Sequence, residues 1–182
     1  DIEKREIFCA RDRYGIKPLY YYKDIINNYH FGSEIKQFTE LPNWDPILNQ
    51  SRALDYMFYA TTDHSEETMF QGVYQILPGN YIKLNVDNYS DVKQTRWYSP
   101  PLNENSNVFE ENSKVFGKLF DKSVRLRLRS DVEVGSALSG GLDSSCIVAK
   151  VSQLLKEENK SELQKTFTAI HDDERFNEEK WA

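Results

Sequence analysis

The sequence predicts an α+β unit followed by the beginning of an α/β unit, and three observations support this prediction. Short apolar and aromatic segments, separated by turn residues, fill residues 1–100 and indicate small sheets with short helices. A polar tract with few apolar side chains follows at residues 101–109 and predicts a linker. Beyond it, a helical pattern precedes a strand, a glycine-rich turn, a second helix and another strand, which is the order of a βαβ unit.

In residues 1–100, strands are expected where apolar and aromatic residues run together, because such side chains fit a half-buried pleated surface. The first three expected strands are separated by turns and predict an antiparallel meander. An amphipathic helix is expected at residues 52–60, where Asn49 or Ser51 can cap the first turn, and a shorter helix at residues 34–38. The expected strands are residues 7–10, 19–22, 29–32, 80–86 and 95–98.

Residues 110–182 predict the start of a second unit built on a βαβ order. A long helical pattern covers residues 110–129. An apolar strand at residues 132–138 leads into the glycine-rich turn, and helical spacing resumes at residues 146–155. A strand at residues 166–170 follows, and a right-handed crossover would place it parallel to the first strand.

The composition indicates a globular protein and argues against several classes of function. Apolar residues make up 39% and charged residues 29% of the 182 residues. The formal net charge of −6 argues against a nucleic-acid partner, which needs a basic face, and no apolar run approaches the roughly 20 residues of a membrane span. Two isolated cysteines, Cys9 and Cys146, suit the reducing cytoplasm. A homodimer is compatible with these features, but the sequence does not reveal the oligomeric state.

The turn at residues 139–145, Ser-Gly-Gly-Leu-Asp-Ser-Ser, has the features of an anion-binding loop. It lies between a strand and a helix, so free backbone N–H groups and the positive end of the helix dipole point at the loop. Two adjacent glycines remove the Cβ atoms that would keep a phosphate away from the backbone, and three serines add hydroxyl donors. We therefore expect a phosphate site here. The alternative is that Gly140 and Gly141 only form a turn.

Asp143 is unusual in such a loop, because a carboxylate repels a phosphate. It makes sense as the N-cap of the following helix, as a ligand of Mg²⁺, or as both. Neither of the two common nucleotide fingerprints, G-x-x-x-x-G-K-[ST] and G-x-G-x-x-G, is found in the sequence. The residues alone leave the role of Asp143 open.

Four short motifs, taken together, resemble one family. The turn at residues 139–145 resembles the PP-loop of the ATP pyrophosphatases, which bind the pyrophosphate part of ATP. The other motifs are R-D-R-Y-G-I-K-P-L-Y-Y at residues 11–21, G-S-E-I-K at 32–36 and S-D-V-E-V-G at 130–135. In this order they resemble the glutamine-hydrolysing asparagine synthetases, in which a class II glutamine amidotransferase domain precedes a PP-loop domain. The resemblance covers nearly the whole chain.

This resemblance implies a fold and an activity. Residues 1–100 would be the C-terminal part of the amidotransferase domain, a partial Ntn-hydrolase αββα sandwich. Residues 110–182 would be the N-terminal part of an adenine nucleotide alpha hydrolase-like PP-loop domain. In this family an N-terminal cysteine frees ammonia from glutamine, MgATP adenylates the side chain of aspartate, and ammonia passes through an internal tunnel to displace AMP. The implied small molecules are glutamine, aspartate, ATP and Mg²⁺.

The resemblance assigns site residues only where the sequence matches the family motifs. Asp12 matches the aspartate that holds the amino group of glutamine; the alternative is a turn aspartate that bonds its own backbone. Leu138 matches a backbone contact to adenine or ribose, and Asp143 the Mg²⁺ site. Ala169 lies where the next strand lines the adenosine pocket, unless it is a plain core alanine. Glu178 matches a recurring acidic position without an assigned role. The positions that match the ATP site are Leu138, Ser139, Gly140, Gly141, Asp143, Ser144, Ser145 and Ala169.

Two positions bear on the missing nucleophile of the family pattern, and a third suggests a separate site. Residue 1 is Asp1, where the amidotransferase nucleophile would be a cysteine, and Cys9 lies in a strand pattern and does not replace it. We therefore expect no catalytic residue in this chain and interpret it as a fragment with little or no activity of its own. His171, followed by three acidic residues, indicates either a metal site or an exposed loop.

Two alternative functions stay open. β-Lactam synthetases and amidotransferases of cell-surface sugar pathways share this layout and would act on another carboxylate. A non-catalytic relative that holds nucleotide without turnover is the other alternative, although the intact PP-loop argues against it.

Overall fold

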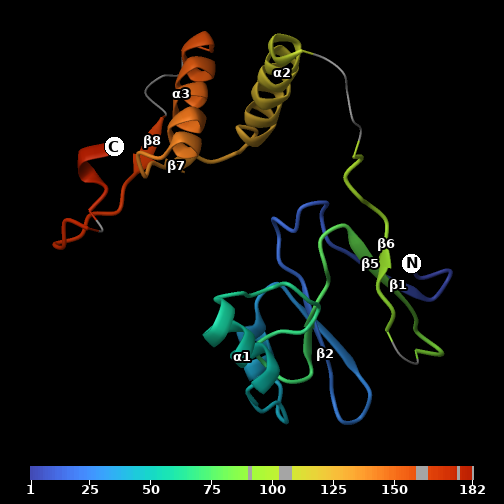
Figure 1. Cartoon of the computed structure of the whole chain (residues 1–182). Helices are drawn as coiled ribbons and strands as arrows, with labels where there is room; N and C mark the ends of the chain where they lie inside the picture. The colour runs from blue at the N-terminus through green and yellow to red at the C-terminus, as the bar shows by residue number, and fades with distance from the viewer. Residues whose placement is uncertain (90–91, 103–107, 159–163, 176, 182) are drawn as a thin grey trace. The chain divides into compact units, whose positions relative to one another are not determined.

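The computed structural model describes residues 1–89, 92–102, 108–158, 164–175 and 177–181. The chain forms two compact units, Asp1–Asn103 and Glu104–Ala182 (Figure 1). The described part of the first unit contains two small antiparallel sheets and a helix, and two helices with a parallel strand pair make up most of the described part of the second.

One sheet of the first unit has the strand order β1-β5-β6. β1 pairs antiparallel with β5, with Cys9 opposite Ile82, and β5 pairs antiparallel with β6 on its other edge. Ile82 and Leu84 of β5 are buried while their neighbours in the strand are more exposed, which is the two-residue period of a sheet with one covered face. These strands are β1 (Glu6–Ala10), β5 (Asn80–Asn85) and β6 (Thr95–Arg96).

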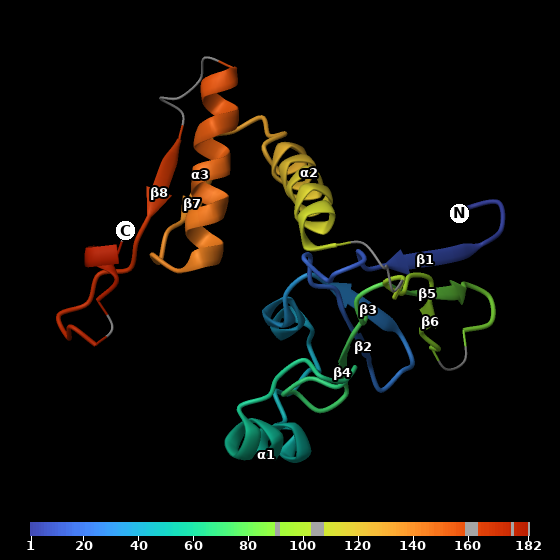
Figure 2. The same ribbon diagram turned by 45° about the horizontal axis from the view of Figure 1, so that its top comes forward.

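The second sheet has β2 at its centre, between β3 and β4 (Figure 2). Tyr21 of β2 lies opposite Phe31 and Tyr74 in the two neighbouring strands, and its ring centroid is 5.4 Å from that of Tyr74. The turn between β2 and β3 contains Asn27 with φ 67°, a conformation that asparagine tolerates. These strands are β2 (Tyr20–Lys23), β3 (Tyr29–Gly32) and β4 (Val73–Gln75).

The predicted meander is therefore only partly correct. The hairpin between the second and third strands forms, but the first strand pairs with β5 and not with β2. The physical reason lies in the segment after β1. The backbone N–H of Arg11 donates to the carbonyl of Asn80 at 3.0 Å and so extends the contact with β5, and the residues that follow form a wide turn around Asp12 instead of a tight hairpin.

The amphipathic helix of the first unit is α1 (Gln50–Tyr59), preceded by the short 3₁₀ helix η1 (Ile35–Glu40). The side-chain oxygen of Asn49 accepts a hydrogen bond from the backbone N–H of Arg52 at 3.4 Å, so the predicted cap is confirmed. The helix ends at Ala60, which has φ 51°.

The core of the first unit connects the two sheets. Tyr21, Ile76 and Ile82 are buried together, and Cys9 packs against them. Burial is the largest cause that raises the pKa of Tyr21 to about 12, and burial also raises the pKa of the Cys9 thiol.

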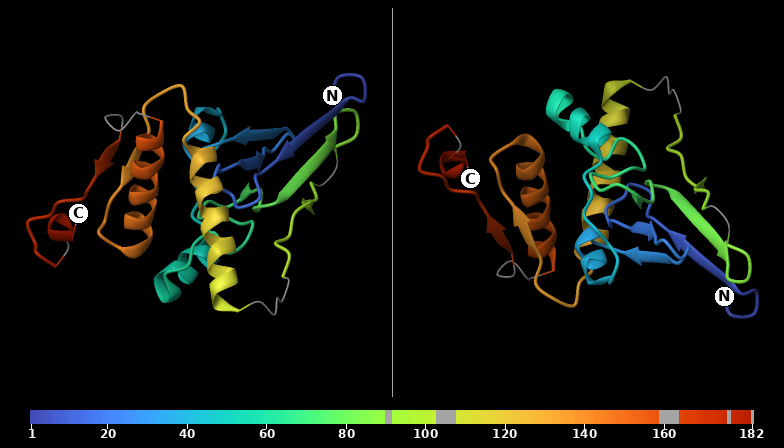
Figure 3. Two further views of the ribbon diagram at one scale, coloured as in Figure 1. Left: turned by 90° about the horizontal axis from the view of Figure 1, so that it is seen from above. Right: turned by 90° about the horizontal axis from the view of Figure 1, so that it is seen from below.

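In the second unit, β7 and β8 form the predicted parallel pair, with Ser136 opposite Thr166. Helix α3 connects them and packs beside β7 (Figure 3), while α2 packs on α3 through Val124, Val151 and Leu154. In the described part of the chain, no helix combines the length and apolar character needed to cross a membrane. The elements are α2 (Phe109–Arg127), β7 (Gly135–Ala137), α3 (Leu142–Glu157), β8 (Lys165–Phe167) and the 3₁₀ helix η3 (Glu179–Trp181).

Candidate functional site

The glycine-rich loop follows directly from the parallel strand pair. The backbone N–H of Leu138 donates to the carbonyl of Phe167 at 2.9 Å, and the carbonyl of Leu138 accepts from the Thr168 hydroxyl at 2.8 Å. These bonds fix the start of the loop at the carboxyl end of β7. They also use the Leu138 N–H, so any backbone contact from Leu138 to a ligand would have to use its carbonyl oxygen.

Ser144 shapes the loop from within. Its hydroxyl donates to the carbonyl of Gly141 at 3.1 Å, and it therefore accepts from the Ser139 hydroxyl, 3.1 Å away, and from the Ser139 N–H at 3.3 Å. Two of the three expected hydroxyl donors are thus engaged inside the loop. Within the described residues, the Ser145 hydroxyl has no such partner.

Helix α3 begins at Leu142, four residues before the predicted start at residue 146. Gly141 occupies the N-cap position with extended backbone angles, and the Ser145 N–H makes the first helical bond to its carbonyl at 3.0 Å. Asp143 is therefore inside the first turn, and the prediction that it caps the helix is wrong. An acidic side chain in the first turn still interacts favourably with the helix dipole.

Several backbone donors are left over at this helix terminus. No hydrogen bond among the described residues uses the N–H groups of Gly140, Gly141, Leu142 or Asp143. Gly140 has φ +71°, a left-handed conformation that a side chain would strain. A run of unpaired N–H groups at the positive end of a 16-residue helix is chemically suited to bind a phosphate or another anion.

The Asp143 carboxylate is exposed and has no hydrogen bond or ion pair within the described residues. No group of three or more His, Cys, Asp or Glu side chains converges in the described part of the chain to hold a metal ion. A cation at this loop would therefore rely on Asp143 together with oxygen atoms of the ligand, which is an arrangement that suits Mg²⁺.

Two of the other predicted positions of the second unit are exposed, and Glu178 is half-buried. Ala169 follows β8 and is exposed in the described part of the chain. His171 is exposed and accepts a hydrogen bond from the Asp173 N–H at 2.9 Å, while Asp173 pairs with Arg175 at 2.6 Å, as expected of an exposed loop. The carbonyl of Glu178 accepts from the Trp181 N–H at 2.9 Å.

Asp12 organises the wide turn between β1 and β2. Its Oδ1 accepts hydrogen bonds from the N–H groups of Tyr14 at 3.1 Å and Ile16 at 3.0 Å, and its Oδ2 accepts from Lys17 at 2.9 Å. These donors, the Lys17 N–H above all, hold the pKa of Asp12 below its usual range. Asp12 therefore does bond the backbone of its own turn.

Gly15 is required at the centre of this turn for two reasons. It has φ +67°, and a Cβ at this position would lie only 2.7 Å from Cγ of Pro78. The glycine thus allows the turn to pack closely against the segment that joins β4 to β5.

Sequence patterns indicated no role for Arg11, which bonds this turn, or for Gln75, which binds Arg11. The Arg11 guanidinium donates to the side-chain oxygen of Gln75 at 2.9 Å, and Gln75 is only 2% exposed. A long polar side chain inside an apolar segment, residues 69–77, was the signal that could have revealed this pair, because buried polar groups need partners.

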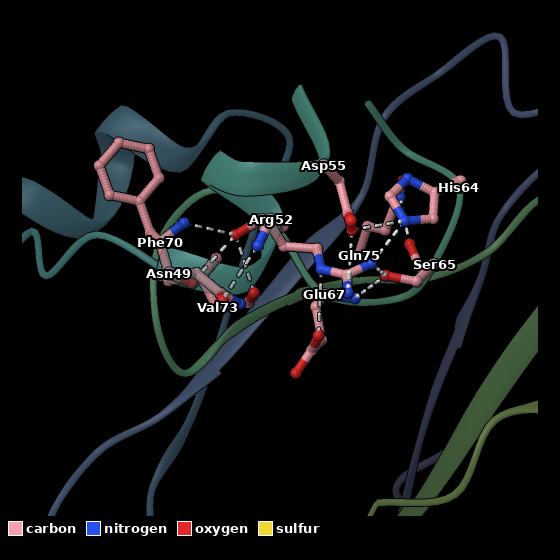
Figure 4. Close-up of polar contacts among 10 residues, drawn as sticks. Asn49, Arg52, Asp55, His64, Ser65, Glu67, Phe70, Val73 and Gln75 are labelled. Carbon is pink, nitrogen blue, oxygen red and sulfur yellow. Dashed lines mark hydrogen bonds and ion pairs between the residues drawn. The ribbon is translucent and has the colours of Figure 1, made fainter. Parts of the chain in front are cut away.

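A second polar cluster lies between α1 and the segment that precedes β4 (Figure 4). Arg52 Nη1 lies 2.5 Å from His64 Nε2 and donates to Ser65 Oγ at 3.2 Å, while Arg52 Nη2 lies 3.1 Å from Asp55 Oδ2. Arg52 and His64 line a cavity of about 270 Å³. Nothing in the polar pattern of residues 61–68 indicated these contacts.

Comparison with known proteins gives two consecutive family matches. Residues 1–98 match the glutamine amidotransferase domain, and residues 116–182 match asparagine synthase. A putative glutamine-hydrolysing asparagine synthetase 2 of Methanocaldococcus jannaschii is 34% identical over 81% of this chain and 28% of its own length. The glutamine-hydrolysing asparagine synthetase 3 of Bacillus subtilis is 30% identical over 88% of the chain and 26% of its own length.

A fungal relative has a different name. The amidase chyE of Penicillium rubens is 30% identical over 88% of this chain and 23% of its own length. The chain thus spans between 23% and 28% of these three relatives. The two consecutive matches, together with these relatives, show that the chain belongs to the glutamine-hydrolysing asparagine synthetase family.

Proposed function

We propose that the protein that carries this chain converts aspartate to asparagine, with glutamine as the nitrogen donor and ATP as the energy source. Two features support this proposal: the order of the two family matches and the names of the bacterial and archaeal relatives. In the proposed reaction ATP adenylates the side-chain carboxylate of aspartate, and ammonia from glutamine displaces AMP. The free thiols of Cys9 and Cys146 support the proposal of a cytoplasmic enzyme.

The observation that carries the proposal is the set of unpaired N–H groups from Gly140 to Asp143 at the start of α3. We propose that they bind the pyrophosphate part of ATP, with Ser139, Ser144 and Ser145 around it. Leu138 and Ala169 would border the nucleoside. Asp143 would bind Mg²⁺ together with phosphate oxygens, because its carboxylate has no partner among the described residues.

The glutamine half of the proposal depends on Asp12. Four lone-pair positions surround a carboxylate, and the three N–H donors of the turn leave about one of them for the ammonium group of glutamine. We propose that residues 1–100 belong to an Ntn-type sandwich, residues 101–109 to a linker and residues 110–182 to a PP-loop domain. No residue of this chain is proposed as the nucleophile, and the Cys9 thiol packs against the core.

A second candidate function has its own support. Relatives named as amidases, from Penicillium rubens and Gibberella zeae, each match over 88% of this chain. An enzyme of the same layout that acts on a carboxylate other than aspartate is therefore the alternative.

The test uses the protein produced from its native gene. Pyrophosphate release should require ATP, Mg²⁺ and aspartate, and asparagine should form when glutamine is added. If other carboxylates but not aspartate trigger pyrophosphate release, the alternative function replaces the proposed one. Without any carboxylate-dependent release, the protein is a nucleotide-binding relative without turnover. The 182-residue chain alone should release no pyrophosphate.

A further inference from the structure

The Arg11 side chain binds the Asp12 turn through two of its carbonyl groups. Its Nε donates to the carbonyl of Lys17 at 3.1 Å, and its Nη2 donates to the carbonyl of Gly15 at 3.0 Å. Its Nη1 donates in the other direction, to the Gln75 side chain at 2.9 Å and to the carbonyl of Ile76 at 2.8 Å. One guanidinium thus joins the turn to β4 and the residue after it.

One peptide group of the turn is held at both ends. The carbonyl of Gly15 and the N–H of Ile16 belong to the same peptide group; Arg11 binds the carbonyl and Asp12 binds the N–H at 3.0 Å. Because C=O and N–H point in opposite directions in a trans peptide, the two bonds together fix the rotation of this group. The rotation decides whether the N–H points at Asp12.

Gln75 fixes the position of the guanidinium. Its Nε2 donates to the carbonyl of Ser65 at 2.7 Å, so its Oε1 faces Arg11, and the side chain is only 2% exposed. Gln94 donates to the carbonyl of Gln75 at 2.9 Å and so holds the backbone of the same residue. The partner of Arg11 is therefore a buried side chain whose amide oxygen and nitrogen are both hydrogen-bonded.

We propose that Arg11 is a positioning residue for the amidotransferase site: its four hydrogen bonds orient the turn so that the Asp12 carboxylate keeps one free acceptor position for the ammonium group of an amino-acid substrate. The binding of a substrate ammonium group at Asp12 rests on the proposed function. The orientation of the turn by Arg11 does not rest on it. Arg11 itself has no direct contact with Asp12 in this arrangement, because its donors all reach backbone or Gln75 acceptors.

The first experiment measures the turn in the 182-residue chain by amide hydrogen exchange. In Arg11→Lys the charge stays but the planar set of donors is lost, and exchange of the Ile16 and Lys17 amides should accelerate by about tenfold or more. Amides of the β2–β3 hairpin in the same molecule are the internal reference. Arg13→Lys is the matched control, because the Arg13 guanidinium lies over the Trp97 and Tyr98 rings and not at the Asp12 turn.

A milder variant keeps the test informative if Arg11→Lys also disturbs the hairpin. Gln75→Met removes one of the four acceptors of Arg11 and fills the buried position with a side chain of similar length, so the Ile16 and Lys17 amides should again exchange faster than the hairpin amides. Unchanged exchange of these two amides in both variants would overturn the positioning role. Equal acceleration in Arg13→Lys would overturn it as well.

The second experiment measures the glutaminase reaction of the protein from its native gene. Arg11→Lys should raise the KM for glutamine by about tenfold and change kcat much less, because it disturbs binding at Asp12 and not the chemical step. Asp12→Asn should raise the KM at least as much. If Asp12→Asn has no effect while Arg11→Lys loosens the turn, the proposed function of Asp12 fails and the positioning of the turn stands. If Asp12→Asn raises the KM and Arg11→Lys does not, the role of Arg11 in substrate binding fails.

Discussion

Replacing Gly140 with alanine should weaken the glycine-rich loop, whereas the same replacement at Gly141 should leave it almost unchanged. Gly140 has φ +71°, and an alanine in this left-handed conformation costs about 1–2 kcal/mol. Its Cβ would also lie 2.6 Å from the carbonyl oxygen of Trp181, so that segment would have to shift. We expect a loss of at least about 1–2 kcal/mol in the local free energy of unfolding.

Gly141 is the matched control because its backbone is ordinary. It has φ −70°, and the nearest atom to a Cβ at this position is Oγ of Ser139 at 3.4 Å, a normal contact. Two small effects oppose each other. Alanine lowers the entropy of the unfolded chain, which stabilises by about 0.4–1 kcal/mol, but it is a poorer N-cap than glycine by up to about 1 kcal/mol. The net change should be close to zero.

Hydrogen exchange of the Ser145 amide measures this difference, because this N–H makes the first bond of α3 to the Gly141 carbonyl. Gly140→Ala should accelerate its exchange by roughly 5–30-fold, which corresponds to about 1–2 kcal/mol, and should weaken MgATP binding in a titration calorimeter. The reasoning is refuted if the two variants accelerate exchange equally. It is also refuted if Gly140→Ala has no effect on either measurement.

Three further predictions follow from the same contacts. The pKa of Asp12 is lower in the folded chain than in the unfolded chain. The stabilisation of its turn is therefore complete above the ordinary pKa of aspartate and is lost as the pH falls through the lower folded value. The chemical shift of the Lys17 amide should report this transition, and Asp12→Asn should abolish it. Asp143→Asn should reduce the Mg²⁺-dependent part of ATP affinity by about tenfold or more, and an unchanged Mg²⁺ dependence would show that the carboxylate only interacts with the helix dipole. Leu154→Ala should lower the free energy of unfolding measured in urea by about 2–5 kcal/mol, because this side chain is 1% exposed and packs between α2 and α3. Leu119→Ala is the control: this side chain is 62% exposed, and its replacement should change the free energy of unfolding by less than about 0.5 kcal/mol.

Local patterns in the sequence predicted most of the elements that surround the candidate site. The apolar strand before residue 139, the glycine pair and the helix after it are encoded by neighbouring residues, and the parallel pairing of β7 with β8 is typical of two strands joined by a helix. The cap by Asn49 was predictable for the same reason, since a cap bonds a residue three positions away. The motifs also indicated the family without any structure.

The tertiary structure decided which groups inside these motifs remain available. The sequence predicted three serine donors in the loop, but the hydroxyls of Ser139 and Ser144 bond each other and the loop backbone. It left Asp143 as a cap or a metal ligand, and the earlier start of α3 excluded the cap. Propensity cannot locate a helix start to the residue, because the competing caps differ by about 1 kcal/mol or less.

Long-range contacts mark the limit of what the sequence by itself determined. The pairing of β1 with β5 forms within one sheet, and the bond from Arg11 to Gln75 connects to the other sheet. Both join residues that are distant in the chain and become neighbours only when it folds. Short motifs predict which functional groups a turn contains, because its carboxylate, its glycine and its backbone groups lie within a few residues of each other. Only the packed structure shows which buried partner holds that turn in place, because a buried polar group takes its partner from whichever segment the fold brings beside it.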